Sequence, residues 1–119
     1  MVGSSTEFDA VLELCQDQHR RIILAALAHE NRSLTMNDLK QIIVDQNHHT
    51  AITELSGEEI SDIQISLLHT HIPKLEDLSI VEYDRERQLV EPTPQFEQLE
   101  PQLSAIIDID PGLDPPVTL

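Results

Sequence analysis

Residues 68–91 constrain the fold of this chain more than any other segment. They begin with the end of an amphipathic helix and continue into a run of β-branched and aromatic residues over 80–84. The charged triplet at 85–87 separates this run from a second short apolar segment over 88–91. Two short strands joined by a turn of this length predict a β-hairpin with a charged tip. The chain therefore places a helix directly before a hairpin.

Three helices are predicted before that segment. Apolar residues over 8–15 recur at the spacing of one helix face. Asp17 is a residue type that begins a helix, and Thr35 with Asp38 three positions later forms a capping pattern. The helices that these signals predict span residues 6–16, 17–29 and 36–46.

A fourth helix leads into the hairpin. Ser56 and Glu59 form a capping box at its start, and its apolar stripe continues as far as Leu78. Pro73 has no amide hydrogen, so we expect either a kink there or a new helical turn with the proline at its first position. The polar and unpatterned residues 47–55 before this helix are predicted to form a loop.

The length of the chain suits one domain with short extensions. Pro94 begins a last amphipathic helix, whose apolar side either packs on the same chain or pairs with a second copy. The sequence after it is rich in residues that break regular structure. The predicted organisation comprises a flexible N-terminus at 1–5, a helix-and-hairpin domain at 6–92, a C-terminal helix at 93–108 and a flexible tail at 109–119.

The chain is strongly acidic. It has 22 aspartate and glutamate residues against 7 lysine and arginine residues, which gives a net charge of −15. Such a surface repels nucleic acid and anionic membranes in dilute salt. At molar salt the Debye length falls to about 3 Å, so the repulsion is screened almost to contact. This composition is typical of salt-adapted proteins, and we expect a halophilic, archaeal source; an ordinary acidic protein is the alternative.

The sequence predicts a cytoplasmic protein. Cys15 is the only cysteine, so no disulfide can form within the chain and a reducing compartment is expected. No apolar run approaches the roughly 20 residues of a membrane span. The first residues lack the basic and apolar regions of a signal peptide.

Catalytic chemistry is not indicated. The 3 glycines are scattered, so they form no glycine-rich phosphate loop, and Cys15 falls on a predicted buried helix face. The carboxylates are spread along the chain instead of being paired in an apolar setting. We therefore expect neither an enzyme nor a cofactor.

The histidines do not predict a metal site. His69 and His71 are two positions apart and face different sides of a helix. A helix boundary is expected between Cys15 and His19, and another pair of histidines falls in the predicted loop. No set supplies the three or four converging ligands that zinc needs. Six histidines in an acidic domain suggest proton sensing as a further hypothesis.

Arg20 and Arg21 stand near the start of the second predicted helix, where cations oppose the helix dipole. Cations in this position need an anionic partner, which is either a nearby carboxylate or a phosphate. The abundance of carboxylates in the chain favours the first.

The segment His71-Ile-Pro-Lys-Leu-Glu-Asp-Leu-Ser-Ile-Val-Glu-Tyr-Asp84 resembles the signature of a large haloarchaeal family of small winged helix-turn-helix proteins, regarded as transcription regulators. Asp17-Gln-His-Arg-Arg-Ile-Ile-Leu24 resembles the start of that family's second helix. The resemblance spans about residues 8–92. It implies a mainly α fold with a small β-hairpin wing, a recognition helix at about 57–72 and a wing at about 80–91. It also implies DNA binding, and related regulators are often homodimers.

More distantly, the segment resembles the recognition helix and wing of arsenic-repressor-like regulators. Carried over to this chain, the resemblance implies base and phosphate contacts, since glutamine pairs with adenine and lysine with guanine or phosphate. The implied DNA-contacting residues are Gln64, Ser66, His69, Thr70, Lys74, Arg85 and Arg87. One departure is that such helices usually carry a basic residue in their first half, where this chain has Asp62.

Two functions are consistent with the sequence. The first is a sequence-specific DNA-binding transcription regulator, and the second is a winged-helix adaptor that docks basic segments of a protein in the transcription machinery. A basic patch of Lys74, Arg85 and Arg87 would favour the first, and a uniformly negative surface the second. Asp84 and Glu86 stand beside the two arginines, so local ion pairs are the alternative to DNA contact there.

Overall fold

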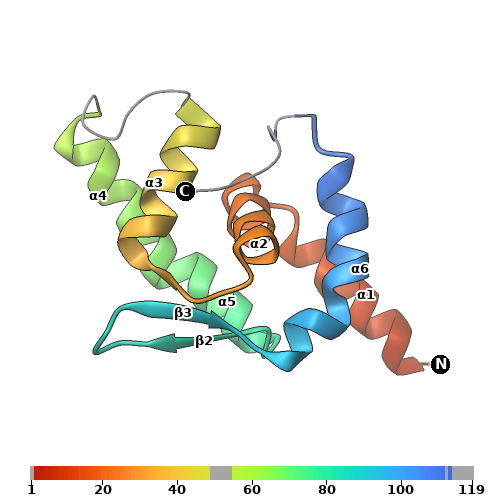
Figure 1. The fold of residues 1–119 in the computed structure, drawn as a ribbon. Helices are drawn as coiled ribbons and strands as arrows, with labels where there is room; N and C mark the ends of the chain where they lie inside the picture. Colours follow the sequence, from red (N-terminus) through yellow and green to blue (C-terminus); the bar gives the residue numbers. More distant parts are fainter. Residues whose placement is uncertain (1, 49–54, 112, 114–119) are drawn as a thin grey trace.

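The computed structural model describes residues 2–48, 55–111 and 113 (Figure 1). Most of these residues are helical, and a small antiparallel sheet accompanies the helices. The helices are α1 (Val2–Leu14), α2 (Gln18–Glu30), α3 (Met36–His48), α4 (Gly57–Ser66), α5 (Ile72–Asp77) and α6 (Pro94–Asp108). The strands are β1 (Leu34–Thr35), β2 (Val81–Asp84) and β3 (Leu89–Pro92). No helix within the described ranges is long and apolar enough to cross a membrane.

The predicted hairpin is confirmed, and the sheet has a third strand. β2 pairs antiparallel with β3, with Tyr83 opposite Val90. β1 lies on the other side of β3, with Leu34 opposite Val90, so the strand order is β1-β3-β2. The amide of Met36 extends this pairing by donating to the carbonyl of Gln88 over 3.0 Å. β1 has only two residues, which are too few for an alternating pattern to predict it.

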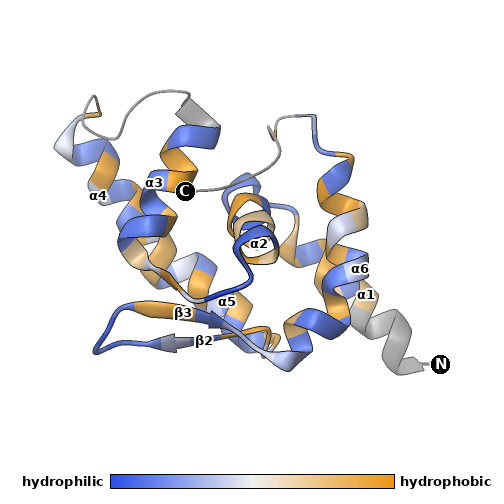
Figure 2. Ribbon diagram, in the orientation of Figure 1, coloured by the Kyte–Doolittle hydropathy of each residue, from blue (hydrophilic) through white to orange (hydrophobic). Residues whose placement is uncertain are grey.

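One aliphatic core joins the helices to the sheet. Its largest fully buried side chains are Ile22, Ile23, Leu24, Leu27, Leu34, Leu39, Ile42, Ile43, Leu67, Ile72, Leu75 and Ile80. Hydrophobic and hydrophilic positions alternate along the helices, as amphipathic helices require (Figure 2). The burial of this apolar surface holds the helices and the hairpin in fixed relative positions.

α4 and α5 are joined by a π turn (Leu67–His71). At its end the amide of Ile72 donates to the carbonyl of Leu67, the wider bond pattern of a π turn. Pro73 is the second residue of α5. His71 and Ile72 both have right-handed helical backbone angles, so the chain passes from the π turn into α5 without leaving the helical conformation. The departure from regular α-helical bonding expected near Pro73 is the π turn that ends two residues before it.

Several predicted boundaries differ from the observed ones. α1 begins at Val2, whereas the predicted first helix begins at residue 6. α3 continues to His48, so the predicted loop at 47–55 starts too early. Residues 49–54 of that loop lie outside the described residues.

The predicted helix caps are confirmed. Ahead of α2, Asp17 accepts hydrogen bonds from the amides of His19 and Arg20 at 2.8 and 3.4 Å. Ahead of α4, Ser56 accepts one from the amide of Glu59 at 3.1 Å. These bonds depend on spacings of two or three residues, which a sequence displays directly.

α6 packs against α1 and α2 of its own chain (Figure 1). Phe96, Leu99 and Leu103 of α6 are buried, so the first of the two predicted uses of this helix is the observed one. Phe8 and Leu12 of α1 are exposed to solvent. The helical spacing over residues 8–15 predicts that they share a face with Val11 and Cys15, which are buried.

Candidate functional site

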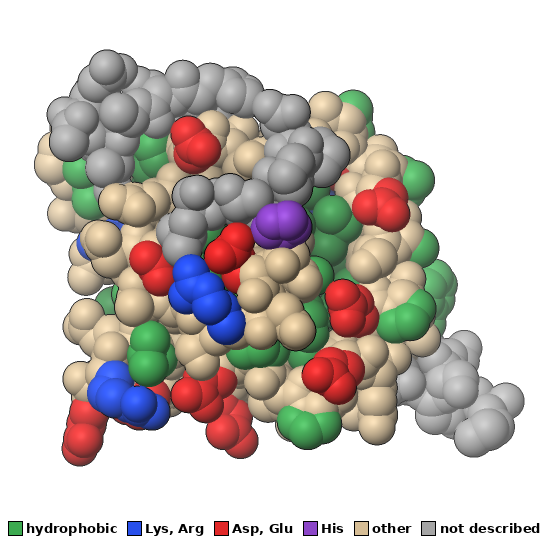
Figure 3. Space-filling model, in the orientation of Figure 1, with side chains coloured by type: hydrophobic (Ala, Val, Ile, Leu, Met, Phe, Trp, Pro, Cys, Tyr) green, Lys and Arg blue, Asp and Glu red, His purple; other side chains and the backbone are tan. Residues whose placement is uncertain are grey.

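The seven residues implied as DNA contacts lie on α4, the π turn, α5 and the hairpin. All of them are exposed except Ser66, which is half-buried. They do not form one cluster, because the fold brings two of them into one hollow and places the others elsewhere. On the visible face, basic side chains stand apart from one another with acidic side chains near them (Figure 3).

A hollow of about 360 Å³ lies between the helical segment 68–76, which comprises most of the π turn and the start of α5, and the hairpin. It is lined by Leu68, His69, Ile72, Pro73, Glu76, Tyr83 and Arg85. His69 comes from the π turn and Arg85 from the hairpin tip, so candidates from two elements meet there. Within the described part of the chain, Arg85 forms no ion pair. A free guanidinium beside an imidazole can bind an anionic group such as a phosphate.

Lys74 lies in a different place. It lines a separate hollow of about 180 Å³ together with residues of α1. Two carboxylates, those of Glu13 and Asp77, line the same hollow. Lys74 follows His69 by five positions, a spacing that does not put two helical residues on one face. The basic patch expected for a DNA-binding surface is therefore not assembled from Lys74 and the two hairpin arginines.

Arg87 is held by carboxylates of its own hairpin. Its Nε donates to Asp84 over 2.8 Å, and its Nη2 lies 3.8 Å from Glu91. The hydrogen bond from the Arg87 side chain, followed by amide hydrogen bonds, holds the pKa of Asp84 below its usual range. The hydrogen bond and charge of Asp84 raise the pKa of Arg87 in turn. Local ion pairing is thus observed for Arg87, whereas Arg85 is left available at the tip.

The exposed side of α4 is acidic. Glu58 and Asp62 are exposed there, and Ile65 is an apolar side chain that is 55% exposed. Gln64 accepts a hydrogen bond from Lys40 of α3 over 3.4 Å, so this candidate already has a partner within the protein. α4 therefore offers a partner carboxylates and one apolar side chain.

Arg20 and Arg21 cap the end of α1. Arg20 donates from Nε to the carbonyl of Leu14 over 2.6 Å and from Nη2 to that of Glu13 over 3.3 Å. Arg21 donates from Nη1 to the carbonyl of Cys15 over 2.6 Å. The last carbonyls of a helix have no intrahelical donor, and the two guanidinium groups supply it. Both arginines are therefore engaged within the protein.

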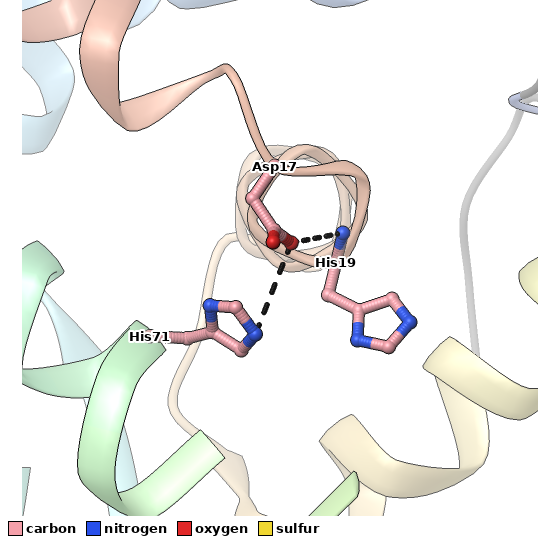
Figure 4. Close-up of side chains that lie close together, drawn as sticks. All are labelled: Asp17, His19 and His71. Atoms are coloured by element: carbon pink, nitrogen blue, oxygen red, sulfur yellow. Dashed lines mark hydrogen bonds and ion pairs between the residues drawn. The ribbon is translucent and has the colours of Figure 1, made fainter. Parts of the chain in front are cut away.

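A second cluster joins the start of α2 to the π turn (Figure 4). Asp17, His19 and His71 place atoms that can ligate a metal within 4.8 Å of one another. Nε2 of His71 lies 3.8 Å from Oδ1 of Asp17, and the two imidazole rings meet edge to face with centroids 5.8 Å apart. We expected no set of three potential metal-ligating residues to converge, and the positions of Asp17, His19 and His71 show that this expectation is wrong. Spacing rules miss this cluster because its two halves lie on different elements.

Arg20 determines which nitrogen of His71 carries the proton. Its Nη1 lies 3.3 Å from Nδ1 of His71. A guanidinium only donates, so Nδ1 presents its lone pair and the proton of the neutral ring sits on Nε2. A metal ion at Nε2 would need the opposite tautomer, with Nδ1–H directed at an acceptor. In this arrangement the lone pair of His71 is directed at Arg20, and the nitrogen that faces Asp17 carries a hydrogen, so the tautomer does not favour a metal ion between His71 and Asp17.

Burial and charge both act on the pKa values of the cluster. Burial lowers the pKa of His71 most, the carboxylate of Asp17 raises it, and Arg20 and His19 lower it, so that it lies below its usual range. Burial raises the pKa of Asp17, but His71 and the amides of His19 and Arg20 outweigh burial and bring it below its usual range. At neutral pH the cluster therefore combines a neutral imidazole with a carboxylate and a guanidinium.

The family model of a domain of unknown function, DUF7344, matches residues 12–91, and the chain belongs to this family. The match contains the hairpin, the helix before it and the cluster around His71, and it ends before α6. No curated protein and no solved structure matches the chain.

Proposed function

We propose that this member of the DUF7344 family is a DNA-binding transcription regulator with a winged-helix fold. In this proposal α4 and the π turn are the recognition helix, and the β2–β3 hairpin is the wing. The order of elements supports it, because α4 and the π turn are followed by α5 and then by the hairpin, which matches the order of recognition helix and wing that the resemblance implies. The pairing of β1 with β3 adds support, since it ties the hairpin to the helical core.

The hollow lined by His69 and Arg85 is the main structural support for the proposal. His69 and Arg85 line it together, one from each of the two elements that a winged helix applies to DNA. A guanidinium can bind a phosphate with two hydrogen bonds or enter a narrow minor groove. The proposed contacts therefore centre on His69, Thr70 and Arg85, with Gln64 at the edge next to α3.

The proposal places the protein in a salt-adapted cytoplasm. A net charge of −15 opposes DNA binding in dilute salt, and molar salt screens that repulsion. Each phosphate contact changes the logarithm of the binding constant by only about 0.9 per decade of salt. Binding through one available arginine is therefore expected to depend on shape and base contacts more than on counterion release.

A homodimer belongs to the same proposal, because two copies of a winged helix read two half-sites. The apolar face of α6 is used within its own chain, so a dimer contact involves another surface. The mass measured by sedimentation in molar salt tests this point, and a monomer at every concentration would contradict it.

Selection from random duplex DNA in molar potassium chloride tests the proposed function, and we expect one sequence to be enriched. Arg85→Gln and Arg87→Gln form a matched pair, because both remove one cation from the hairpin but only Arg87 has an ion pair. We expect Arg85→Gln to weaken binding to all sequences and to reduce the salt slope by about 1, and Arg87→Gln to change both far less. A selection without enrichment, or equal effects of the two variants, would contradict the proposal.

The acidic side of α4 favours a second candidate function, an adaptor that binds a basic segment of a protein partner. Glu58 and Asp62 would pair with lysine or arginine, and Ile65 would bury apolar surface. The double variant Glu58→Gln, Asp62→Asn separates the two functions. It should weaken capture of a partner if α4 docks protein, and it should leave DNA binding unchanged or stronger if α4 faces DNA.

A further inference from the structure

We infer that the contact between Arg20 and His71 positions the recognition helix on α2 and opens when His71 takes up a proton. The contact joins an arginine that caps α1 to the last residue of the π turn. Its consequence for DNA rests on the function proposed above, whereas the conformational change itself does not.

Arg20 is not free to move away from His71. The two residues are buried, with 6% and 4% of their surfaces exposed. The guanidinium donates to the carbonyls of Leu14 and Glu13, and its withdrawal would leave the Leu14 carbonyl without the hydrogen bond of 2.6 Å that Arg20 supplies. The remaining Nη1 therefore stays directed at Nδ1 of His71, 3.3 Å away.

Protonation of His71 makes both partners hydrogen-bond donors. The neutral ring accepts at Nδ1, but the imidazolium carries a hydrogen on each nitrogen. Two positive groups then face each other, donor against donor, in a buried site where charges interact strongly. Since Arg20 is held in place, His71 is the group that moves.

Asp17 supplies the alternative partner. Its Oδ1 lies 3.8 Å from Nε2 of His71, just beyond hydrogen-bond range. Among the described residues, the charged or titratable groups that act on His71 are Asp17, Arg20 and His19, all at the start of α2. Only Asp17 attracts a cation, so protonated His71 shifts from Arg20 toward the carboxylate that caps α2.

The π turn provides the segment that moves. His71 is its last residue, and the turn already departs from α-helical hydrogen bonding. His69 and Thr70 lie in the same turn and are exposed. A displacement of His71 therefore moves two proposed DNA contacts while α2 and the hairpin keep their places.

The opening falls on the acid side of neutral pH. The pKa of His71 lies below its usual value of about 6.5, chiefly because the ring is buried. The closed contact is therefore present at pH 7 and is lost as the pH falls through the pKa of the folded protein. The pKa of Asp17 is also lowered, so its carboxylate stays charged through this range.

NMR titration of the full chain in molar salt, from about pH 8 to about pH 5, tests the inference across the range in which histidine titrates. Nitrogen shifts of the imidazoles report the tautomer, and the amides of residues 67–72 report the π turn. We expect the neutral ring of His71 to carry its proton on Nε2. We also expect the amides of residues 67–72 to shift with one midpoint, equal to the His71 pKa and below about 6.5.

His71→Gln is the test variant, because the glutamine oxygen can accept from Arg20 but does not titrate. His29→Gln is the matched control, since His29 is an exposed histidine in the last turn of α2. The transition in residues 67–72 is expected in the wild type and in His29→Gln and is expected to be absent from His71→Gln. A transition of the same size in His71→Gln would overturn the inference.

The wild type alone decides the matter if His71→Gln does not fold. A neutral His71 with its proton on Nδ1 would overturn the inference, as would an ordinary His71 pKa without a change in residues 67–72. Stoichiometric Zn²⁺ offers a third readout: it should leave the ring signals of His19 and His71 unchanged, and a shift in both would show that the Nε2 lone pair is available.

These measurements contain no DNA, so their outcome is independent of the proposed function. Once a binding sequence is known, the ratio of affinities above and below the His71 midpoint should differ from one in the wild type and in His29→Gln. The ratio should be closer to one in His71→Gln, because the contribution of His71 is absent there. An intact transition with equal affinities on both sides would overturn the consequence for DNA.

Discussion

The Nε atom of Arg21 lies 2.7 Å from a carboxylate oxygen of Asp110, a residue 89 positions later in the chain. The same guanidinium donates from Nη1 to the carbonyl of Cys15 over 2.6 Å. One side chain at the start of α2 therefore holds both the end of α1 and the segment that follows α6. The carboxylate partner expected for the paired arginines exists for Arg21, but it is distant in sequence.

We expect Arg21→Ala to lower the free energy of unfolding by about 1–3 kcal/mol, because it removes hydrogen bonds made by a partly buried charged group. Arg32→Ala is the matched control, since Arg32 is exposed and pairs with Glu30 over 3.3 Å. For this control we expect a change within about 0.5 kcal/mol. Denaturant titrations at constant salt measure both variants. Equal losses would mean that the Arg21 contact contributes no more than a surface ion pair.

The parts of the fold that depend on local signals were predictable. The starts of α2, α3 and α4 follow from Asp17, Thr35 and Ser56, each of which bonds an amide two or three positions ahead. The hairpin follows from two short runs and the turn between them. β1 and the π turn have no pattern of their own, because tertiary packing determines both.

The candidate site was less predictable, because long-range contacts build it. The resemblance named His69 and Arg85, but only the fold brings them into one hollow and puts Lys74 beside carboxylates. Arg20 meets His71, 51 positions away, which no spacing rule anticipates. One signal was present: a cation at a helix start, opposed by the dipole, needs acceptors elsewhere in the protein.

Leu67 and Ile65 are two positions apart, yet Leu67 is fully buried and Ile65 is 55% exposed. We expect Leu67→Ala to lower the free energy of unfolding by about 2–5 kcal/mol, because it leaves a cavity in the core. Ile65→Ala should change it by no more than about 0.5 kcal/mol. Denaturant titrations at two protein concentrations measure both. A large, concentration-dependent loss in Ile65→Ala would show that a second copy covers this side chain.

Gly57 is the first residue of α4, and a Cβ added there meets no atom within 4 Å. We expect Gly57→Ala to raise the free energy of unfolding by about 0.4–1 kcal/mol, because alanine restricts the unfolded chain. The neighbouring variant Ser56→Ala should act in the opposite direction, by about 0.5–2 kcal/mol, because it removes the cap of the same helix. Thermal unfolding compares the two, and a lower stability of Gly57→Ala would contradict the prediction.

The protonation of Asp17 is expected to change the free energy of unfolding at acid pH. Burial, the largest single influence, raises its pKa, but His71 and the amides of His19 and Arg20 outweigh burial and lower it. A carboxylate whose pKa is depressed in the folded state contributes stability that is complete above its unfolded pKa, about 3.9. That stability is lost as the pH falls through the folded pKa.

We expect Asp17→Asn to be less stable than the wild type at pH 7, and the difference to shrink as the pH falls below about 4. Asparagine keeps a capping oxygen, so the variant separates the charge from the cap. Asp45→Asn, which removes an exposed carboxylate of α3, is the control and should show little difference at any pH. Denaturant titrations between about pH 7 and about pH 3 measure the free energies of unfolding across this range. A difference that stays constant down to the lowest pH, or no difference at any pH, would contradict the prediction, because neither result depends on the charge of Asp17.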